Sequence, residues 1–473
     1  MSKSLPKNNF LKGILQPWPA ECDIHDIIVL GEIPKELNGT FYRNGPNPQY
    51  VYSEKYHMFE GDGMIHALSL ANGQASYQNR WIRTEKFLAE RHARKALFGG
   101  MRDLMACDDS VKQISRNTAN TNVIWHHDNL LALNEGSPPV KLDRSDLRKC
   151  ETYTFSQSLN RSMMAHPKID PLSGELIFYS YFGPDFRYFI ANKKGEITHQ
   201  ETLAMPFLSL MHDFAITEHF NIFPLFPLTW DFQRVMQGEQ IFKWEANLNT
   251  RFAVMPRYGN SNDVIWFEDE AAMGFHVVNA YEVPDKIILE MVIMDDIPKE
   301  TIAFADDSAV YLNCLTRWIF DLKKKTIIKE RLDDSNVEFP RIDERFTGNH
   351  YRHAYLNCAI EKKELNHFDS IVHWDLKTNH KQIHNFGEGA FPLEPIFVPR
   401  SSNAAEGDGF LLSYVYREAI DRSDLVILDA QQVDDEPLAI IQLPHRVPFG
   451  FHGWVKSIFC CKFPFIRSTV LAC

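Results

Sequence analysis

Apolar and polar residues alternate in short runs along most of this 473-residue chain, and polar turns join the runs in pairs. Alternation with a period of two is typical of half-buried strands, and two such runs across a polar turn predict a β-hairpin. About four strands per blade would let the chain form roughly seven blades of a propeller, so we predict an all-β fold. Five hairpins carry the pattern: VIWHHDNLLAL (123–133), RYFIANKKGEITHQETL (187–203), RWIFDLKKKTIIKERL (317–332), IVHWDLKTNHKQIHNF (371–386) and LVILDAQQVDDEPLAII (425–441).

Two stretches depart from this pattern. Residues 84–105 are rich in Ala, Leu, Glu and Arg until Gly99 and Gly100 interrupt them, which predicts a helix inserted on the sheet scaffold. The chain shows no low-complexity linker, so we predict a single domain over 1–473. Residues 220–236 are strongly apolar, but Pro224 and Pro227 argue against a regular inner strand or helix there.

Residues 220–236 therefore have two interpretations. They form either an apolar tunnel mouth or shallow membrane contact, or a buried loop between blades. Under the first interpretation, the side chains that would line a substrate tunnel are Phe220, Phe223, Phe226 and Trp230.

Composition narrows the classes of partner. The chain is 44% hydrophobic and contains 34 Phe; filling of the core explains most of this aromatic content, and the surplus suits a conjugated or apolar ligand. Its formal net charge is −12 and no Lys/Arg tract stands out, so a nucleic-acid-binding groove is not expected. The phosphate-binding patterns GxGxxG and GxxxxGK[ST] and the nucleophile pattern GxSxG are absent, which disfavours nucleotide binding and serine-hydrolase chemistry.

The sequence also bears on location. No apolar run near residue 1 resembles a signal peptide, and no run approaches the roughly 18 residues that span a bilayer. The eight cysteines form no CxxC pair and are expected to be reduced. We predict a cytoplasmic protein, with peripheral membrane contact left open.

Four histidines are candidate metal ligands. His166, in AHPKIDP, is held in an extended backbone by the following Pro167. The others also stand at the start of strand-like runs. They lie 46, 64 and 176 residues apart in sequence, so only the tertiary fold could bring them together, and inner strands that point at one axis would do so. Four imidazoles without thiolate or carboxylate suit Fe(II), Cu(II), Zn(II) or Ni(II). The set is His166, His212, His276 and His452.

Metal-bound histidines usually donate their second N–H to a carboxylate. Glu338 in VEFPRID and Glu394 in PLEPIFVPR lie among apolar residues, where an unpaired carboxylate would be costly. Glu135 follows the run LLALN and could equally be a solvated turn residue. We expect His126 and His127 to be exposed in a hairpin turn.

Several motifs, in one order, resemble those of the carotenoid cleavage oxygenase family: FYRNGPNP (41–48), FEGDGMIHAL (59–68), NTNVIWHHDNLLALNEG (120–136), AHPKIDPLSGEL (165–176), MHDFAIT (211–217), FHVVNAYE (275–282), EFPRI (338–342), EPIFVPR (394–400) and GFHGWV (450–455). The resemblance implies a seven-bladed β-propeller with a helical and loop lid over its top face and Fe(II) on its axis. It assigns the four histidines as ligands and the three glutamates as their outer partners, and it places the methyl group of Thr121 beside the sixth coordination position.

The resemblance further implies that Fe(II) and O2 cleave a conjugated C=C bond into two carbonyl products. Stilbene-cleaving relatives have a Lys before the first of these glutamates and an upstream Tyr, whereas this chain has Asn134 and no Tyr in 100–120. A carotenoid or apocarotenoid is therefore the favoured substrate. Stilbenoid cleavage, ester isomerisation as in retinoid isomerohydrolases, and a non-catalytic polyene-binding propeller are the alternatives. Residues 456–473 match nothing in the family, and either a membrane-adhering extension or palmitoylation site, or a disordered or altered terminus, fits them.

Overall fold

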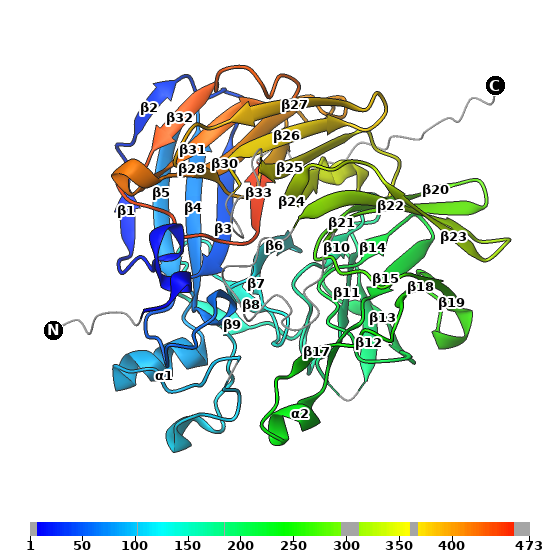
Figure 1. Ribbon diagram of the computed structural model, residues 1–473. Helices are drawn as coiled ribbons and strands as arrows, with labels where there is room; N and C mark the ends of the chain where they lie inside the picture. The colour runs from blue at the N-terminus through cyan, green and yellow to red at the C-terminus, as the bar shows by residue number, and fades with distance from the viewer. Residues whose placement is uncertain (1–6, 102, 184, 295–311, 360–367, 458–473) are drawn as a thin grey trace.

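A computed structural model describes residues 7–101, 103–183, 185–294, 312–359 and 368–457. Within them, seven antiparallel sheets are arranged as the blades of a propeller, which confirms the predicted fold class (Figure 1). Each hairpin of alternating residues became two neighbouring strands, because one face of each strand packs against the next blade. No helix in this part of the chain has both the length and the apolar character needed to cross a membrane.

The first three blades use the N-terminal part of the chain and one strand from its C-terminal part. The first contains β1 (Cys22–Ile24), β5 (Gln74–Trp81), β4 (Gly63–Ala71), β3 (Gly39–Pro46) and β33 (Gly453–Ser457). The second contains β6 (Asn122–His126), β7 (Asn129–Leu133), β8 (Val140–Leu142) and β9 (Cys150–Thr152). The third contains β10 (Lys168–Ile169), β11 (Leu176–Ser180), β12 (Phe186–Ala191) and β13 (Ile197–Leu203).

The other four blades follow in sequence order. The fourth contains β14 (Ala215–Ile216), β15 (Phe220–Leu225), β18 (Thr250–Pro256) and β19 (Ile265–Asp269), and the fifth β20 (Val277–Val283), β21 (Lys286–Met294), β22 (Asn313–Asp321) and β23 (Thr326–Arg331). The sixth contains β24 (Asn336–Ile342), β25 (His353–Ala359), β26 (Ser370–Asp375) and β27 (His380–Asn385). The seventh contains β28 (Ala390–Pro392), β29 (Ile396–Pro399), β30 (Gly409–Arg417), β31 (Arg422–Asp429), β32 (Ala439–Gln442) and β2 (Ile28–Gly31).

Strands distant in sequence close the ring twice. β33 pairs with β3, opposing Gly453 to Arg43, and β2 pairs with β32, opposing Ile28 to Gln442. The innermost strands of neighbouring blades lie side by side, so β33 lies between β6 and β29, and β20 between β14 and β24. Their ends therefore meet near one axis.

A close backbone approach fixes the segment that precedes β33. A Cβ atom on Gly45 would lie 2.5 Å from the Cα of Gly450, so neither strand end tolerates a side chain there. The Phe451 N–H also donates to the Asn44 carbonyl over 3.0 Å. This contact places His452 at the inner edge of the first blade.

The elements outside the blades differ from the sequence prediction. The helix predicted over 84–105 is only α1 (Glu85–Ala93), because Thr84 caps its first turn and Arg94 adopts a left-handed backbone with φ 54° that ends it. Together with α2 (Phe232–Met236), it lies at one end of the propeller (Figure 1). The lid predicted over one face thus contains two short helices and loops within the described residues.

The prediction that residues 220–236 form no regular inner strand holds, because the strand there is the second of its blade, but the prediction that they form no helix is wrong. They form β15, β16 (Leu228–Trp230), which pairs with β17 (Phe242–Trp244), and α2. Pro224 is tolerated in β15 because β14 reaches only Asn221 and Ile222, so the proline has a neighbouring strand on one side alone. The tail predicted at 456–473 begins inside β33, and 458–473 lie outside the described residues.

Candidate metal centre and substrate cavity

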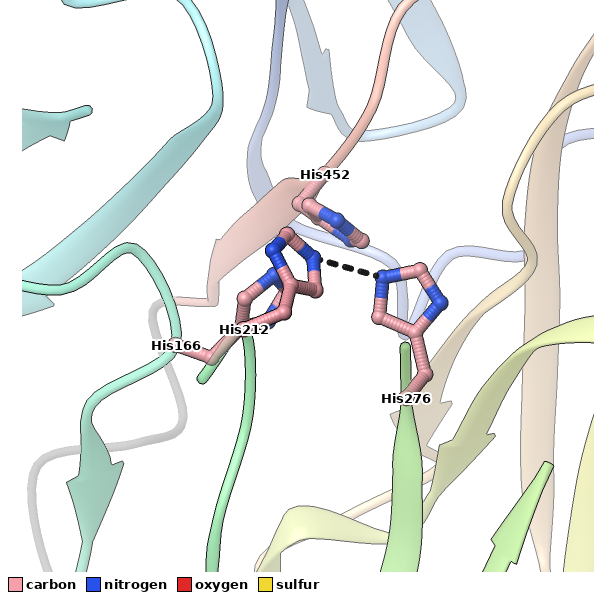
Figure 2. A group of neighbouring side chains, drawn as sticks. All are labelled: His166, His212, His276 and His452. Carbon is pink, nitrogen blue, oxygen red and sulfur yellow. Dashed lines mark hydrogen bonds between the residues drawn. The ribbon is translucent and has the colours of Figure 1, made fainter. Parts of the chain in front are cut away.

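The structure brings the four candidate histidines together, each just before the innermost strand of its blade. His166 precedes β10, His212 precedes β14, His276 precedes β20 and His452 precedes β33. Their rings face one another (Figure 2), and one nitrogen from each lies within 4.8 Å of the corresponding atoms of the others. The Nε2 atoms of His212 and His276 are 3.2 Å apart. Such an arrangement provides four nitrogen donors to a single ion.

Asp213, which the sequence analysis did not single out, ties three ligand-bearing segments together. It is buried at 3% exposure and follows His212 directly. Its Oδ1 atom pairs with the Lys168 ammonium over 2.7 Å, and its Oδ2 atom accepts the Val277 N–H over 2.9 Å. Those partners stand two residues after His166 and one after His276, so one carboxylate fixes the third, fourth and fifth blades relative to each other.

Each of the three glutamates accepts a hydrogen bond from one of the histidines. Glu135 accepts from Nδ1 of His212. Glu338 accepts from Nδ1 of His276 over 2.5 Å, and Glu394 accepts from Nδ1 of His452 over 2.8 Å. Because Nδ1 carries the proton in each pair, Nε2 keeps the lone pair that a metal requires.

Glu394 is the most enclosed of these carboxylates, at 1% exposure. It also pairs with Arg43 over 3.1 Å and lies 3.5 Å from the Arg341 guanidinium. Burial alone would raise its pKa, but Arg341, His452 and Arg43 outweigh burial and hold the pKa at about 2. Glu394 is therefore charged and joins β3, β24 and the final ligand segment.

Two of the candidate ligands are held in the neutral form that a metal requires, whereas burial lowers and Glu338 raises the pKa of His276, with a net increase. Burial holds the pKa of His166 well below its usual value and lowers the pKa of His452 to about 4, so both rings are neutral at pH 7. The Nε2 atom of His166 is buried and has no hydrogen-bond partner among the described residues, although buried ring nitrogens are normally satisfied. A divalent ion within reach of all four rings would satisfy it.

Thr121, directly before β6, lies at the same centre. Its Oγ1 atom donates to Asn120 over 3.1 Å, and its carbonyl accepts the His452 N–H over 3.2 Å. It also lines the cavity described next. The Thr121 hydroxyl therefore forms its hydrogen bond with Asn120 and not with one of the histidines.

A cavity of about 740 Å³ opens beside the histidines. Its walls come from the segments around α1 and α2 and are largely aromatic and aliphatic, and the residues nearest the metal centre are Thr121, Glu135, His212, His276, Glu338 and His452. Of the predicted tunnel residues, Trp230 lines this cavity. The prediction requires correction for Phe220, Phe223 and Phe226, which pack into the core of the third and fourth blades instead.

A family model described as retinal pigment epithelial membrane protein matches residues 15–456. The chain belongs to this family. The family resemblance found in the motifs is thereby confirmed.

Several relatives have names that describe their activity. Isoeugenol monooxygenase of Pseudomonas nitroreducens is 39% identical over 94% of this chain and 97% of its own length. The crystal structure of Pseudomonas brassicacearum lignostilbene dioxygenase is 32% identical and superposes with a TM-score of 0.90, covering 96% of this chain and all of that one. A variant of the Synechocystis apocarotenoid oxygenase is 28% identical with a TM-score of 0.86, covering 93% of this chain and 97% of that one.

The sequence analysis did not predict three side chains that contact the site residues, and its prediction for the exposure of one histidine is wrong. Arg43 stands in the FYRNGPNP motif and Asp213 beside a ligand, so their neighbours in sequence could have signalled them. The Tyr181 hydroxyl donates to Glu135. Because Tyr181 is one of several aromatic residues in its stretch, nothing in the sequence distinguished it as a site residue. His126 was expected to be exposed, but it is 5% exposed with Nε2 3.1 Å from the Gly174 carbonyl, because the neighbouring hairpin covers it.

Replacing Tyr181 by phenylalanine is expected to weaken metal binding by about tenfold, because Glu135 then holds His212 less firmly. Competition with a chelator measures this affinity. Tyr188→Phe is the matched control: it removes a buried hydroxyl of the same blade that donates to Asn221 over 3.1 Å, away from the histidines. Equal losses of affinity in both variants would contradict the role given to Tyr181.

Proposed function

We propose that this protein is an Fe(II)-dependent oxygenase that cleaves the side-chain double bond of an aryl alkene with O2 to give two carbonyl products. The observation that carries the proposal is the convergence of four imidazoles, three of them oriented by buried or half-buried glutamates, at the wall of an apolar cavity. Four imidazole ligands suit Fe(II) and leave coordination positions open on an octahedral ion. When bound, iron supplies the one-electron chemistry that makes O2 reactive towards an alkene.

The choice of substrate rests on the relatives and the cavity. The name of a relative that is 39% identical, isoeugenol monooxygenase, refers to a phenol with a propenyl side chain. The structure of a lignostilbene dioxygenase superposes on this one with a TM-score of 0.90. A cavity of about 740 Å³ is within the usual range for a drug-sized ligand. These findings favour the aryl alkene over the carotenoid that Asn134 had suggested.

An apocarotenoid is the second candidate substrate. The supporting observation is the similarity to the Synechocystis apocarotenoid oxygenase, with a TM-score of 0.86. The largely apolar lining of the cavity would accept a polyene chain as well as an aromatic ring.

The chain's own residues would orient and enclose the substrate. Phe59, Phe182 and Trp230 line the cavity and present flat apolar surfaces to an aromatic ring. Their packing excludes water from the reacting bond and holds one double bond beside the histidines, which raises the effective concentration of the reactants. Thr121 narrows the space next to the ligands.

A substrate panel tests the proposal. The purified, iron-loaded protein is incubated with isoeugenol, a hydroxystilbene and an apocarotenal under air and under nitrogen, and products are identified by mass spectrometry. We expect O2-dependent formation of aldehydes from the aryl alkenes. Their kcat/KM should be at least about tenfold higher than that of the apocarotenal. Turnover of the apocarotenal alone would replace the first candidate by the second, and no turnover of any alkene would reject both.

A further inference from the structure

Two cationic side chains line the cavity within the described part of the chain, and they differ in their surroundings. The Lys86 ammonium is neutralised inside the protein, because it contacts Asp62 over 2.9 Å and Glu90 over 2.8 Å. Arg116 has no carboxylate within 4.0 Å among the described residues; its one hydrogen bond there is a long one of 3.5 Å to the Gly99 carbonyl. A guanidinium has five N–H donors, so most of its capacity is unused.

Arg116 is half-buried, and the other contact of its guanidinium is with an aromatic ring. Its guanidinium lies 5.7 Å from the centroid of the Phe98 ring, and both residues line the cavity. A ring face stabilises the cation modestly but offers no oxygen to accept its hydrogen bonds. A charged group in such a position gains most from a ligand that brings an acceptor oxygen to it.

Arg116 belongs to the segment that leads to the metal centre. The residues 116–121 run directly into β6, and Arg116, Thr118 and Thr121 all line the cavity. His212, His276 and His452 line the same cavity, so the guanidinium and these histidines bound one continuous space. A ligand whose double bond lies near the histidines can therefore direct its far end towards Arg116.

The neighbouring Asn134 cannot take this role. Its Nδ2 atom donates to Thr118 Oγ1 over 3.0 Å and lies 3.2 Å from Asn120 Oδ1, while its Oδ1 atom accepts the Gly136 N–H over 3.1 Å. Both donors and the acceptor are thus engaged within the protein. Arg116 keeps several N–H donors without a protein acceptor, and the buried Trp230 Nε1–H, which also lines the cavity, is a single further donor without an acceptor among the described residues.

We infer that Arg116 recognises the phenolic oxygen of the substrate, at the end of the aromatic ring opposite the double bond that is cleaved. Its planar guanidinium can donate in parallel to a phenol oxygen and to a neighbouring methoxy oxygen, a geometry that an ammonium cannot match. This inference rests on the proposed function for the class of ligand. It makes the hydroxyl group a determinant of substrate choice.

The test measures binding separately from cleavage. The full-length, metal-loaded protein is titrated calorimetrically with 4-propyl-2-methoxyphenol, which has no double bond to cleave, with its methyl ether, and with 4-propylbenzoate. We expect the phenol to bind at least about tenfold more tightly than the ether. Arg116→Gln should weaken phenol binding by about 10- to 100-fold, leave the ether within about threefold, and preserve metal content, while Arg116→Lys should recover part of the loss.

Arg91→Gln is the matched control. Arg91 is exposed on α1, and its guanidinium stacks 5.5 Å from the Phe87 ring centroid, but it does not line the cavity. This variant should bind all three ligands as the wild type does.

The inference is overturned if Arg116→Gln keeps the preference for the phenol, or weakens the phenol and the ether equally. It is also overturned if only the benzoate depends on Arg116, since the recognised group would then be a carboxylate. Binding of the phenol that depends on Arg116, without cleavage of isoeugenol, would instead reject the proposed reaction and support this assignment.

Discussion

His276→Ala is expected to reduce bound iron from about one ion per chain to less than about a tenth of that, and to abolish O2-dependent alkene cleavage. His276 contributes its Nε2 atom 3.2 Å from that of His212, and removal of the ring leaves three donors on one side of the centre. Elemental analysis of anaerobically purified protein measures the loss. A second measurement is the rise in melting temperature on adding Fe(II) or Co(II), which the variant should lack because ligand binding stabilises only a competent site.

The control for this prediction is another buried histidine. His66 is 3% exposed, and its Nδ1 atom is 2.7 Å from the Tyr77 hydroxyl in the first blade, outside the four-histidine group. His66→Ala creates a comparable cavity and is expected to lower stability without lowering iron content. Full iron in His276→Ala would count against the proposed metal centre.

Glu394→Gln is expected to destabilise the protein by about 3–5 kcal/mol, because it leaves two arginines without their buried anion. The substitution preserves the size of the side chain, yet Arg43 loses an ion pair of 3.1 Å and Arg341 one of 3.5 Å. His452 also loses a charged acceptor, so metal affinity should fall by about 10- to 100-fold. Denaturant unfolding at pH 7, with and without metal, separates the two effects.

Glu344→Gln provides a matched comparison, since Glu344 pairs with the same Arg341 over 2.9 Å but its side chain is 44% exposed. Solvent screens this pair, so its loss should cost no more than about 1 kcal/mol. Similar costs for the two variants would show that the burial of Glu394 does not determine its contribution.

The fold and the ligand positions were accessible from sequence for physical reasons. Period-two alternation survives in each blade because one strand face packs against its neighbour, and this marks hairpins locally. His212, His276 and His452 stand directly before such runs, where a propeller brings strand ends together. Glu338 and Glu394 were recognisable because their neighbours are apolar, whereas the position of Glu135 was indicated by the family resemblance alone.

Other features depend on contacts that no local pattern encodes. Phe223 and Trp230 are both aromatic residues of one apolar stretch, yet Trp230 lines the cavity and Phe223 does not. The difference arises because Phe223 lies in the fourth blade, whereas Trp230 lies in β16, which pairs with β17 in a separate two-stranded sheet. The end of α1 depends on the backbone of Arg94 rather than on helix propensity. The partner of Tyr181 lies 46 residues away in the preceding blade.

The double closure of the ring has a consequence for biosynthesis. His452 reaches the axis only when β33 pairs with β3, so the fourth donor joins after all seven blades have emerged from the ribosome. A chain that ends before this strand would therefore lack the fourth donor of the proposed metal centre, and metal binding by that centre requires the completed propeller.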